Sequence, residues 1–414
     1  MNVGQTRRTA CGVGVAWVAA LAAVAVLLAF SRYESRDPDS ALHAAISSDL
    51  ARRPFHEWIA PEWNGHWTLQ GLYREHPVGV FLVPAVAARL GYPSAQAAYA
   101  VNAVYQILTL WLMLALARQF LSWRESRVLV TLLLLLPIAF TYRIRANHEQ
   151  PLLMCFLAAC YGIERSRSSL KWAALSVAGF AGLFLVKGVF VAVAMTACAA
   201  WLAVRQWRWP EDVDQARPWI GLAVAVASLL LLVVAYEAAY ASAVGERFFP
   251  WYSARQSGVA LATGTAHPVR GALYSFSWYL GRIAWFTAPW SLAALVGCWR
   301  GGGWLRRPPG RRRADAATRA ACKGATLCVV VAVTYLAAFG VFERRADRYI
   351  FPVYYFLAAW WAAYGLRLIP WLRRLAWGAT RAVYPYDQVI VWFCSVLLAL
   401  VAASWHLPNI KIWH

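Results

Sequence analysis

Residues 172–204 read WAALSVAGFAGLFLVKGVFVAVAMTACAAWLAV, an apolar run interrupted by Lys187 and Gly188. The run is roughly 33 residues long, whereas one transmembrane helix needs about 20. A Lys-Gly pair near its middle therefore predicts a hairpin of two membrane-spanning helices that turns at Lys187-Gly188. The loops on either side of such a hairpin must lie on the same side of the membrane.

The composition of the whole chain is typical of a polytopic membrane protein. Its 414 residues are 61% hydrophobic and only 14% charged, with a mean hydropathy of +0.48. Soluble domains carry about 25% charged residues. We therefore predict an all-α polytopic membrane protein, organised as a single transmembrane domain over residues 1–414 with no soluble C-terminal domain.

Apolar segments predict about eleven transmembrane helices, and two outer loops of unusual length. The segment 77–90 is too short to cross, so it is predicted to be an interfacial helix within the first outer loop, 31–94. The second long outer loop is 242–274. The predicted spans lie near 11–30, 95–117, 128–142, 149–164, 172–186, 188–204, 218–241, 275–298, 324–342, 349–367 and 389–405.

The net charge of +21, from 40 basic and 19 acidic residues, would suggest a nucleic-acid partner in a soluble protein. In a membrane protein it is explained by Lys and Arg collecting in cytoplasmic loops. The spans above place the basic loops 118–127, 165–171, 299–323 and 368–388 on one side. We therefore expect no nucleic-acid partner, and an integral protein of the bacterial cytoplasmic membrane whose long loops face outward.

Charged and titratable residues crowd into the first outer loop, between positions 36 and 75. Charges held against a bilayer are expensive and commonly mark a functional site. Asp37 and Asp39, just beyond the first span, are candidates for a general base that takes the proton of an attacking hydroxyl. Alternatively both are solvated loop acids, or Asp39 caps a helix over residues 40–52.

Glu75, His76 and Pro77 open the predicted interfacial helix, where Pro also suits a first helical turn. Glu75 could orient a base or hold a metal, and His76 could contact a phosphate. Asp39 and His43 are four residues apart and share a helix face. A divalent metal held by Asp39, His43 and Glu75 is therefore an open hypothesis.

Basic residues form further clusters at the outer turns, and the last of them places three Arg where the usual charge bias of membrane proteins does not. Guanidinium groups there suit a lipid-linked phosphate, which they grip with two hydrogen bonds. The alternative is that each side chain reaches ordinary lipid headgroups. The clusters are Arg143, Arg145, His148 and Glu149; Lys187; and Arg344, Arg345, Asp347 and Arg348.

Seven stretches resemble, in order, motifs of the type-C glycosyltransferase superfamily, in its branch of protein O-mannosyltransferases and lipid A aminoarabinose transferases. One is Asp-Ser-Ala-Leu-His-Ala-Ala-Ile-Ser from Asp39, which is similar to an Asp-Glu-x-x-Tyr-x-x-x-Ser start. Another is Lys187-Gly188, which is similar to a Thr-Lys-Gly turn. The seven stretches are 39–47, 58–65, 74–77, 145–152, 182–188, 274–291 and 348–352.

The resemblance implies an inverting sugar transfer from a polyprenyl-phosphate donor at the outer membrane face. By position Asp39 matches the catalytic base, with Asp37 second. Glu149 matches an acid of the second outer loop, and Lys187, Arg348 and His76 match positions near the donor phosphate. The chain departs from the family where Ser40 replaces Glu, Glu149 replaces Asp and His76 replaces Lys.

We therefore expect a hexosyl- or pentosyltransferase that works on a hydroxyl of a glycan, lipid or protein acceptor. The sugar and acceptor are not specified by the sequence. Two other interpretations stay open: a transporter or flippase of polyprenyl-linked sugars, and a non-catalytic partner in an envelope-assembly complex. Against the transporter, polar residues gather at the outer boundary and no internal repeat is seen, whereas transporters place them near mid-membrane in repeated halves.

Overall fold

The computed structural model describes residues 37–63, 71–122, 145–212, 215–261, 268–287, 316–342 and 345–361, with isolated positions between 125 and 142. The described chain is a helical bundle, and its one β-bridge joins Glu62 to Leu72. The predicted all-α membrane fold is confirmed. The predicted spans near 11–30 and 389–405 lie outside the described residues.

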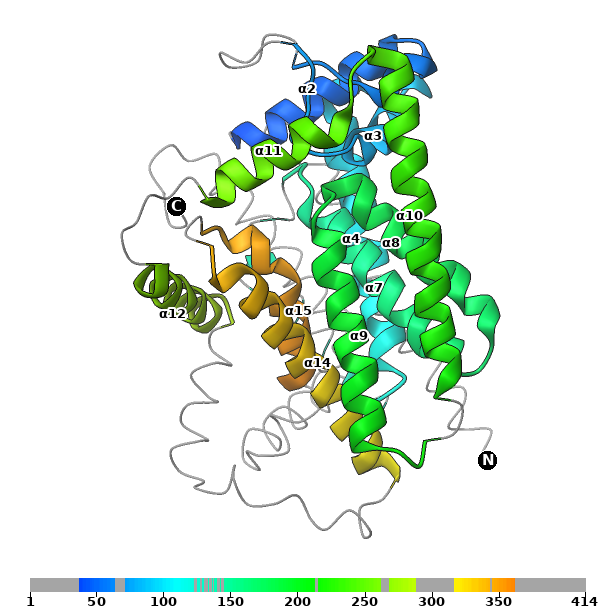
Figure 1. Cartoon of the computed structure of the whole chain (residues 1–414), viewed down its shortest axis with the longest axis vertical. Coiled ribbons are helices and arrows are strands. Elements are labelled where there is room, and N and C mark those ends of the chain that lie inside the picture. The colour runs from blue at the N-terminus through cyan, green and yellow to red at the C-terminus, as the bar shows by residue number, and fades with distance from the viewer. Residues whose placement is uncertain are drawn as a thin grey trace, which may run out of the picture.

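Long helices run along the major axis of the bundle, and shorter ones gather at one end (Figure 1). The long helices are α4 (Ser94–Ala117), α7 (Glu149–Ser166), α8 (Ala173–Lys187), α9 (Phe190–Arg208), α10 (Ala216–Val244) and α14 (Ala316–Gly340). The α2 end of the bundle holds α2 (Pro38–Arg52), η1 (Phe55–Ile59), α3 (Gly79–Arg89) and α11 (Phe248–Leu261). The remaining elements are η2 (Leu170–Trp172), α12 (Pro268–Phe286), η3 (Asp347–Ile350) and α15 (Phe351–Trp360).

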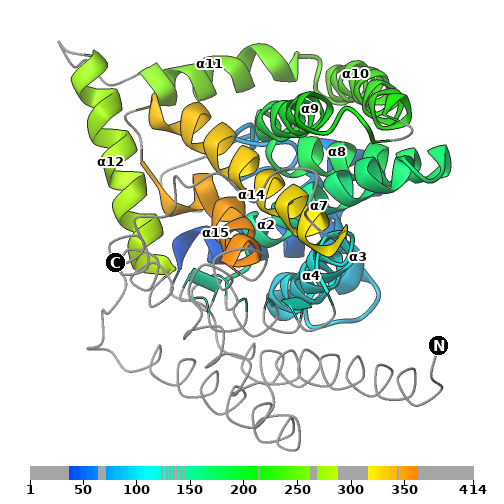
Figure 2. The same cartoon turned by 90° about the horizontal axis from the view of Figure 1, so that it is seen from below.

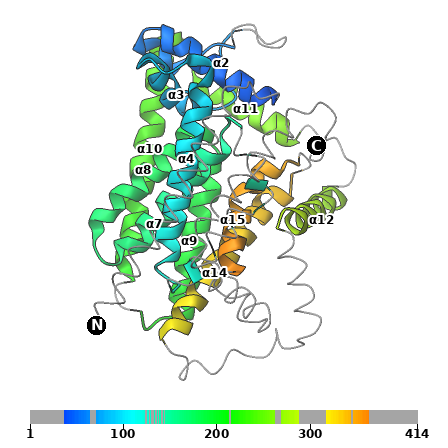
Figure 3. The ribbon, with the colours of Figure 1, turned by 180° about the vertical axis from the view of Figure 1, so that it is seen from behind.

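Five helical segments among the described residues are long and apolar enough to cross a membrane. The short apolar helix α3 does not reach that length, as its sequence predicted, and it lies near α2 at the end of the bundle (Figure 3). Seen from below, α12 lies at the edge of the bundle, where it packs against α14 and η3 (Figure 2). The five segments are Ser94–Ala117, Leu170–Lys187, Phe190–Arg208, Ala216–Val244 and Arg319–Gly340.

The predicted hairpin at Lys187-Gly188 is present. Helix α8 ends at Lys187 and α9 begins at Phe190. Gly188 has a φ of +45°, in the region that only glycine adopts without strain. Glycine is therefore what allows two antiparallel helices to meet in so short a turn.

Close packing of α7 against α8 fixes which residues meet at the α2 end. A β-carbon on Gly179 would collide with the α7 backbone at Ala159, and one on Gly162 would collide with Ser176 of α8. Small residues at such contacts let membrane helices approach closely. Because α7 and α8 run antiparallel, the first residue of α7, Glu149, comes to lie beside the last residue of α8, Lys187.

Helix α2 begins two residues earlier than the sequence suggested, and its cap is a different carboxylate. Asp37 is the N-cap: its Oδ2 accepts from the Ser40 backbone N–H at 3.2 Å, and Pro38 occupies the first turn. Asp39 therefore lies inside the first turn and is not the cap. The negative charge of its carboxylate is still stabilised by the positive, N-terminal end of the helix dipole.

The second long outer loop is more helical than the sequence predicted. Glu237 of α10 accepts from the backbone N–H groups of Phe248 and Phe249, both at 3.1 Å, and so caps α11. Gly245 takes the left-handed conformation that ends α10. Helix α12 starts at Pro268 rather than near position 275, and residues 288–298 of that predicted span lie outside the described part of the chain.

An ion-pair network ties the helices together at the opposite end of the bundle. Arg205 of α9 donates to both carboxylate oxygens of Glu164 at 2.6 Å and to Asp212 at 3.1 Å. Lys323 of α14 reaches the other oxygen of Asp212 at 2.5 Å. These contacts anchor α14 to α7 and α9, and with it the chain that leads to η3 and α15.

Candidate active site

Five segments distant in the sequence meet at the α2 end of the bundle. They are the first turns of α2 and α7, the α8–α9 turn, residues 74–78 and η3. Their titratable side chains contact one another in the pairs described below. The convergence expected from the separate outer clusters is therefore present for most of the predicted residues.

The carboxylate of Asp39 pairs with the guanidinium of Arg348, which comes from η3. The Asp39 side chain is 47% exposed and that of Arg348 is 27% exposed. Burial, the largest single effect, would raise the pKa of Asp39, but the charge and hydrogen bond of Arg348, together with His43 and Lys187, hold that pKa below its ordinary value. Asp39 is thus an ionised carboxylate. One of its oxygens accepts a hydrogen bond from Arg348, and the rest of the side chain is exposed enough for a substrate to contact it.

Lys187 and Glu149 form a buried ion pair beside Asp39. Lys187 Nζ lies 3.8 Å from Glu149 Oε1, and the two side chains are 3% and 1% exposed. Nζ also lies over the Phe190 and Tyr349 rings, at 4.6 and 5.6 Å from their centroids. Within the described residues neither Glu149 oxygen has a hydrogen-bond donor. A carboxylate without such donors is costly to bury, which is a common property of functional sites.

Three histidine rings pack against one another in the same region, one pair tilted and the other edge-on. His148 lies between His43 and His76, with centroid separations of 4.8 and 4.7 Å. His43 Nδ1 is 3.0 Å from the Ala146 carbonyl oxygen, which fixes that nitrogen as the donor. Burial lowers the pKa of His43 to about 4 and that of His76 well below its ordinary value. These rings are neutral near pH 7, so His76 supplies no positive charge for a phosphate.

Asp37 holds loop 145–148 against α2. Its Oδ2 accepts from Ser40 Oγ at 2.6 Å, and Ser40 Oγ in turn accepts from the Ala146 N–H at 3.0 Å. Arg145 lies 3.6 Å from the other Asp37 oxygen. Both predicted residues, Asp37 and Arg145, are thus engaged with each other, and Oδ2 of Asp37 already serves as the helix cap.

Replacing Asp37 by Ala should lower the free energy of unfolding by about 1 kcal/mol, because the N-cap bond is lost. Asp37→Asn keeps an acceptor oxygen and should be close to wild type in stability. Thermal unfolding of the detergent-solubilised protein measures both. Equal stability of the wild type and Asp37→Ala would contradict the capping role.

Two predicted residues do not join the Asp39 pair. The Arg345 guanidinium lies over the Tyr274 ring of α12, at 4.2 Å from its centroid. Glu75 pairs instead with Arg255 of α11, whose Nε donates to Glu75 Oε1 at 3.0 Å. No motif or spacing singles out Arg255, which lies 180 residues from Glu75 in the chain. Arg143 and Arg344 lie outside the described residues.

Comparison with solved structures places this arrangement in a known fold. ArnT from Cupriavidus metallidurans bound to undecaprenyl phosphate superposes with a TM-score of 0.67 at 16% identity, over 96% of this chain and 72% of that chain. The chain has the type-C glycosyltransferase fold. The resemblance inferred from the motifs is confirmed at this level.

Two further matches extend the type-C comparison. The oligosaccharyltransferase of Archaeoglobus fulgidus, in complex with Zn and sulfate, gives a TM-score of 0.56 at 10% identity, over 94% of this chain. AglB from the same organism, with an inhibitory peptide and a dolichol-phosphate, gives 0.51 at 11% identity, over 95% of this chain. This chain spans 53% and 55% of those proteins.

Comparison of the sequence with protein families also finds a glycosyltransferase match, over a shorter part of the chain. Residues 75–236 match the family described as dolichyl-phosphate-mannose-protein mannosyltransferase. This range includes Glu149 and Lys187 and lies between Asp39 and Arg348 in the sequence. No curated protein matches the sequence.

The metal suggested by the sequence finds no ligand set within the described residues of this type-C fold. There, no three His, Cys, Asp or Glu side chains are placed to hold a metal ion. His43 is bonded through Nδ1 to a backbone carbonyl, and Glu75 faces Arg255. Asp39, His43 and Glu75 therefore do not form the hypothesised site.

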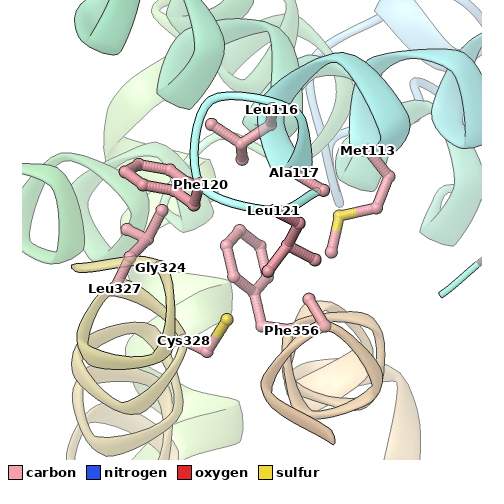
Figure 4. A pocket seen from close by; sticks show the side chains of 10 residues that line it. Met113, Leu116, Ala117, Phe120, Leu121, Gly324, Leu327, Cys328 and Phe356 are labelled. Carbon is pink, nitrogen blue, oxygen red and sulfur yellow. The ribbon is translucent and has the colours of Figure 1, made fainter. Parts of the chain in front are cut away.

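A cavity lower in the type-C bundle differs in chemistry from the Asp39 cluster (Figure 4). It lies between α4 with its following turn, α14 and α15, and has a volume of about 20 Å³. None of its lining residues is charged, so it suits hydrocarbon rather than a sugar or a phosphate. Its lining is Met113, Leu116, Ala117, Phe120, Leu121, Gly324, Leu327, Cys328, Phe356 and Ala359.

Proposed function

We propose that this chain is a membrane glycosyltransferase that moves a hexosyl or pentosyl group from a polyprenyl-phosphate donor to an acceptor hydroxyl. The observation that carries the proposal is the half-exposed Asp39 carboxylate, held by Arg348 next to the buried Lys187–Glu149 pair. A base and two fixed cations within one polar cluster are what such a transfer requires. The type-C fold and the match to a mannosyltransferase family support the same activity.

Asp39 is proposed as the general base. As the acceptor oxygen attacks the anomeric carbon, its proton passes to the Asp39 carboxylate and the bond between that carbon and the phosphate oxygen breaks. Attack from the side opposite the leaving phosphate inverts the anomeric configuration. Because Arg348 holds one Asp39 oxygen, the other oxygen keeps a defined direction toward the acceptor.

Lys187 and Arg348 are proposed to receive the phosphate. The departing polyprenyl phosphate gains negative charge in the transition state, and fixed cations stabilise that charge most effectively where water is excluded. Lys187 is 97% buried and so has little competing solvation. Arg145, bound to Asp37, is proposed to support loop 145–148, and neutral His76 to give a hydrogen bond rather than a charge.

The same proposal includes the lipid of the donor and the side of the membrane that the site faces. ArnT was solved with undecaprenyl phosphate and AglB with a dolichol-phosphate, and a polyprenyl chain of that kind suits the apolar bundle below the Asp39 cluster. The charge pattern of the loops supports an outward-facing α2 end in a bacterial inner membrane. Acceptor recognition then falls to the segments 31–94 and 242–274 or to a partner protein.

The rate of transfer should be nearly independent of pH between about 5 and 8. The pKa of Asp39 is lowered, so the base is ionised throughout this range and is lost only as the pH falls through that lowered value. His43 and His76 also have lowered pKa values and stay neutral. A kcat/KM profile measured with purified enzyme checks this. A step of one proton near pH 6.5 would contradict it.

A flippase for the same lipid would need the same phosphate grip, and a non-catalytic partner protein would need neither base nor donor. Proteoliposomes separate the three functions when labelled donor is placed in the accessible leaflet together with an envelope extract as acceptor. We expect label to appear on the acceptor. Movement of intact donor across the bilayer indicates the flippase, and donor that neither moves nor is consumed indicates the partner protein.

A further inference from the structure

Helix α11 carries side chains that contact two separate parts of the proposed donor site. Tyr252, Arg255 and Gln256 lie within about one turn of α11 and so share a helix face. Tyr252 contacts the α8–α9 turn that holds Lys187, and Arg255 and Gln256 contact Glu75, next to His76. None of these three residues was suggested by the sequence.

The Tyr252 hydroxyl joins the two ends of the hairpin turn. It accepts from the Val189 N–H at 2.8 Å and lies 3.5 Å from the Lys187 carbonyl oxygen, to which it can donate. The Val189 N–H precedes α9, and the Lys187 carbonyl ends α8. Groups at helix ends lack intrahelical partners, so one hydroxyl satisfies a donor and an acceptor that neither helix can satisfy.

The position of this hydroxyl is itself fixed. Tyr252 is 6% exposed and stacks on Phe248 with a centroid separation of 5.4 Å. A β-carbon at position 188 would collide with the Tyr252 hydroxyl, so the Gly188 turn is shaped around it. The same face of α11 continues to Gln256, whose Nε2 donates to the Glu75 carbonyl oxygen at 2.9 Å.

We propose that α11 positions the donor-phosphate site, with Tyr252 holding Lys187 in place through the Lys187–Val189 turn and Gln256 holding the Glu75–His76 segment. Tyr252 touches neither the donor nor the acceptor in this account. It is a positioning residue, and its effect passes through Lys187. The inference rests on the proposed role of Lys187 in binding the phosphate.

Tyr252→Phe keeps the ring and removes the hydroxyl, so it tests this inference with little risk to folding. We expect affinity for undecaprenyl phosphate, measured on the purified full chain, to fall about 3- to 10-fold, as for loss of one or two hydrogen bonds. The Lys187→Met background provides the decisive readout. If Tyr252 acts through Lys187, adding Tyr252→Phe to the Lys187→Met variant should cause little further loss of affinity for undecaprenyl phosphate.

Ser253→Ala is the matched control, because Ser253 is the exposed neighbour of Tyr252 on α11. It should bind undecaprenyl phosphate as the wild type does, and Gln256→Leu should bind more weakly. Tyr252→Phe binding equal to wild type, or an equal loss in the Lys187→Met background, would overturn the inference. A wild type that binds no undecaprenyl phosphate would instead reject the proposed function itself.

Discussion

Asp39→Asn should lower the transfer rate by about two to four orders of magnitude, the usual contribution of a positioned general base. The amide has nearly the shape of the carboxylate but cannot take a proton from the acceptor. Affinity for the donor should change little, because the phosphate is assigned to Lys187 and Arg348. Initial transfer rates and donor binding, measured on the same purified variant, give both quantities.

Asp49→Asn is the matched control for this variant. Asp49 lies on the same helix, and its carboxylate pairs with Arg53 at 2.6 Å, away from Arg348. It should retain the wild-type rate. If Asp39→Asn were as active as Asp49→Asn, Asp39 would not be the base, and Asp37 would become the next candidate.

Lys187→Met should have the second large effect, on both folding and donor binding. It leaves Glu149 as an unpaired carboxylate that is 1% exposed, and breaking a buried ion pair from one side costs about 3–5 kcal/mol. Unfolding of the purified variant should therefore begin at a markedly lower temperature. Donor binding should weaken strongly as well but stay measurable, because Arg348 is then the one remaining member of the two cations proposed to receive the phosphate.

The double variant Lys187→Met with Glu149→Leu separates these two effects. Replacing both members of a buried pair by apolar residues is often neutral for stability. We expect the double variant to recover most of the lost stability and none of the donor binding. Recovery of donor binding along with stability would show that Lys187 is a structural residue only.

The hairpin and the helical class could be predicted from the sequence because each depends on local chemistry. A run too long for one span must turn, and Lys187-Gly188 is where it does. The sequence also predicted that Asp39, Glu149, Lys187 and Arg348 would share a site. That expectation came from the sidedness of the loops, which charge bias largely determines.

Contacts that depend on the packing of distant segments could not be predicted. The cap of α2 is Asp37 rather than Asp39, because Pro38 starts the helix earlier than the pattern after Asp39 suggested. Glu75 meets Arg255, and Arg345 meets Tyr274, since α11 and α12 lie against these loops. No periodicity or spacing in a single sequence encodes such pairings.

Release of polyprenyl phosphate is the most direct test that this chain is a transferase with Asp39 as its base. Purified protein is mixed with a polyprenyl-phosphate sugar and an envelope acceptor extract, and the freed lipid phosphate and the transferred sugar are both counted. The wild type and Asp49→Asn should release one lipid phosphate for each sugar transferred, and Asp39→Asn almost none. Donor that stays intact with the wild type, or equal release by the Asp39→Asn variant, would contradict the account.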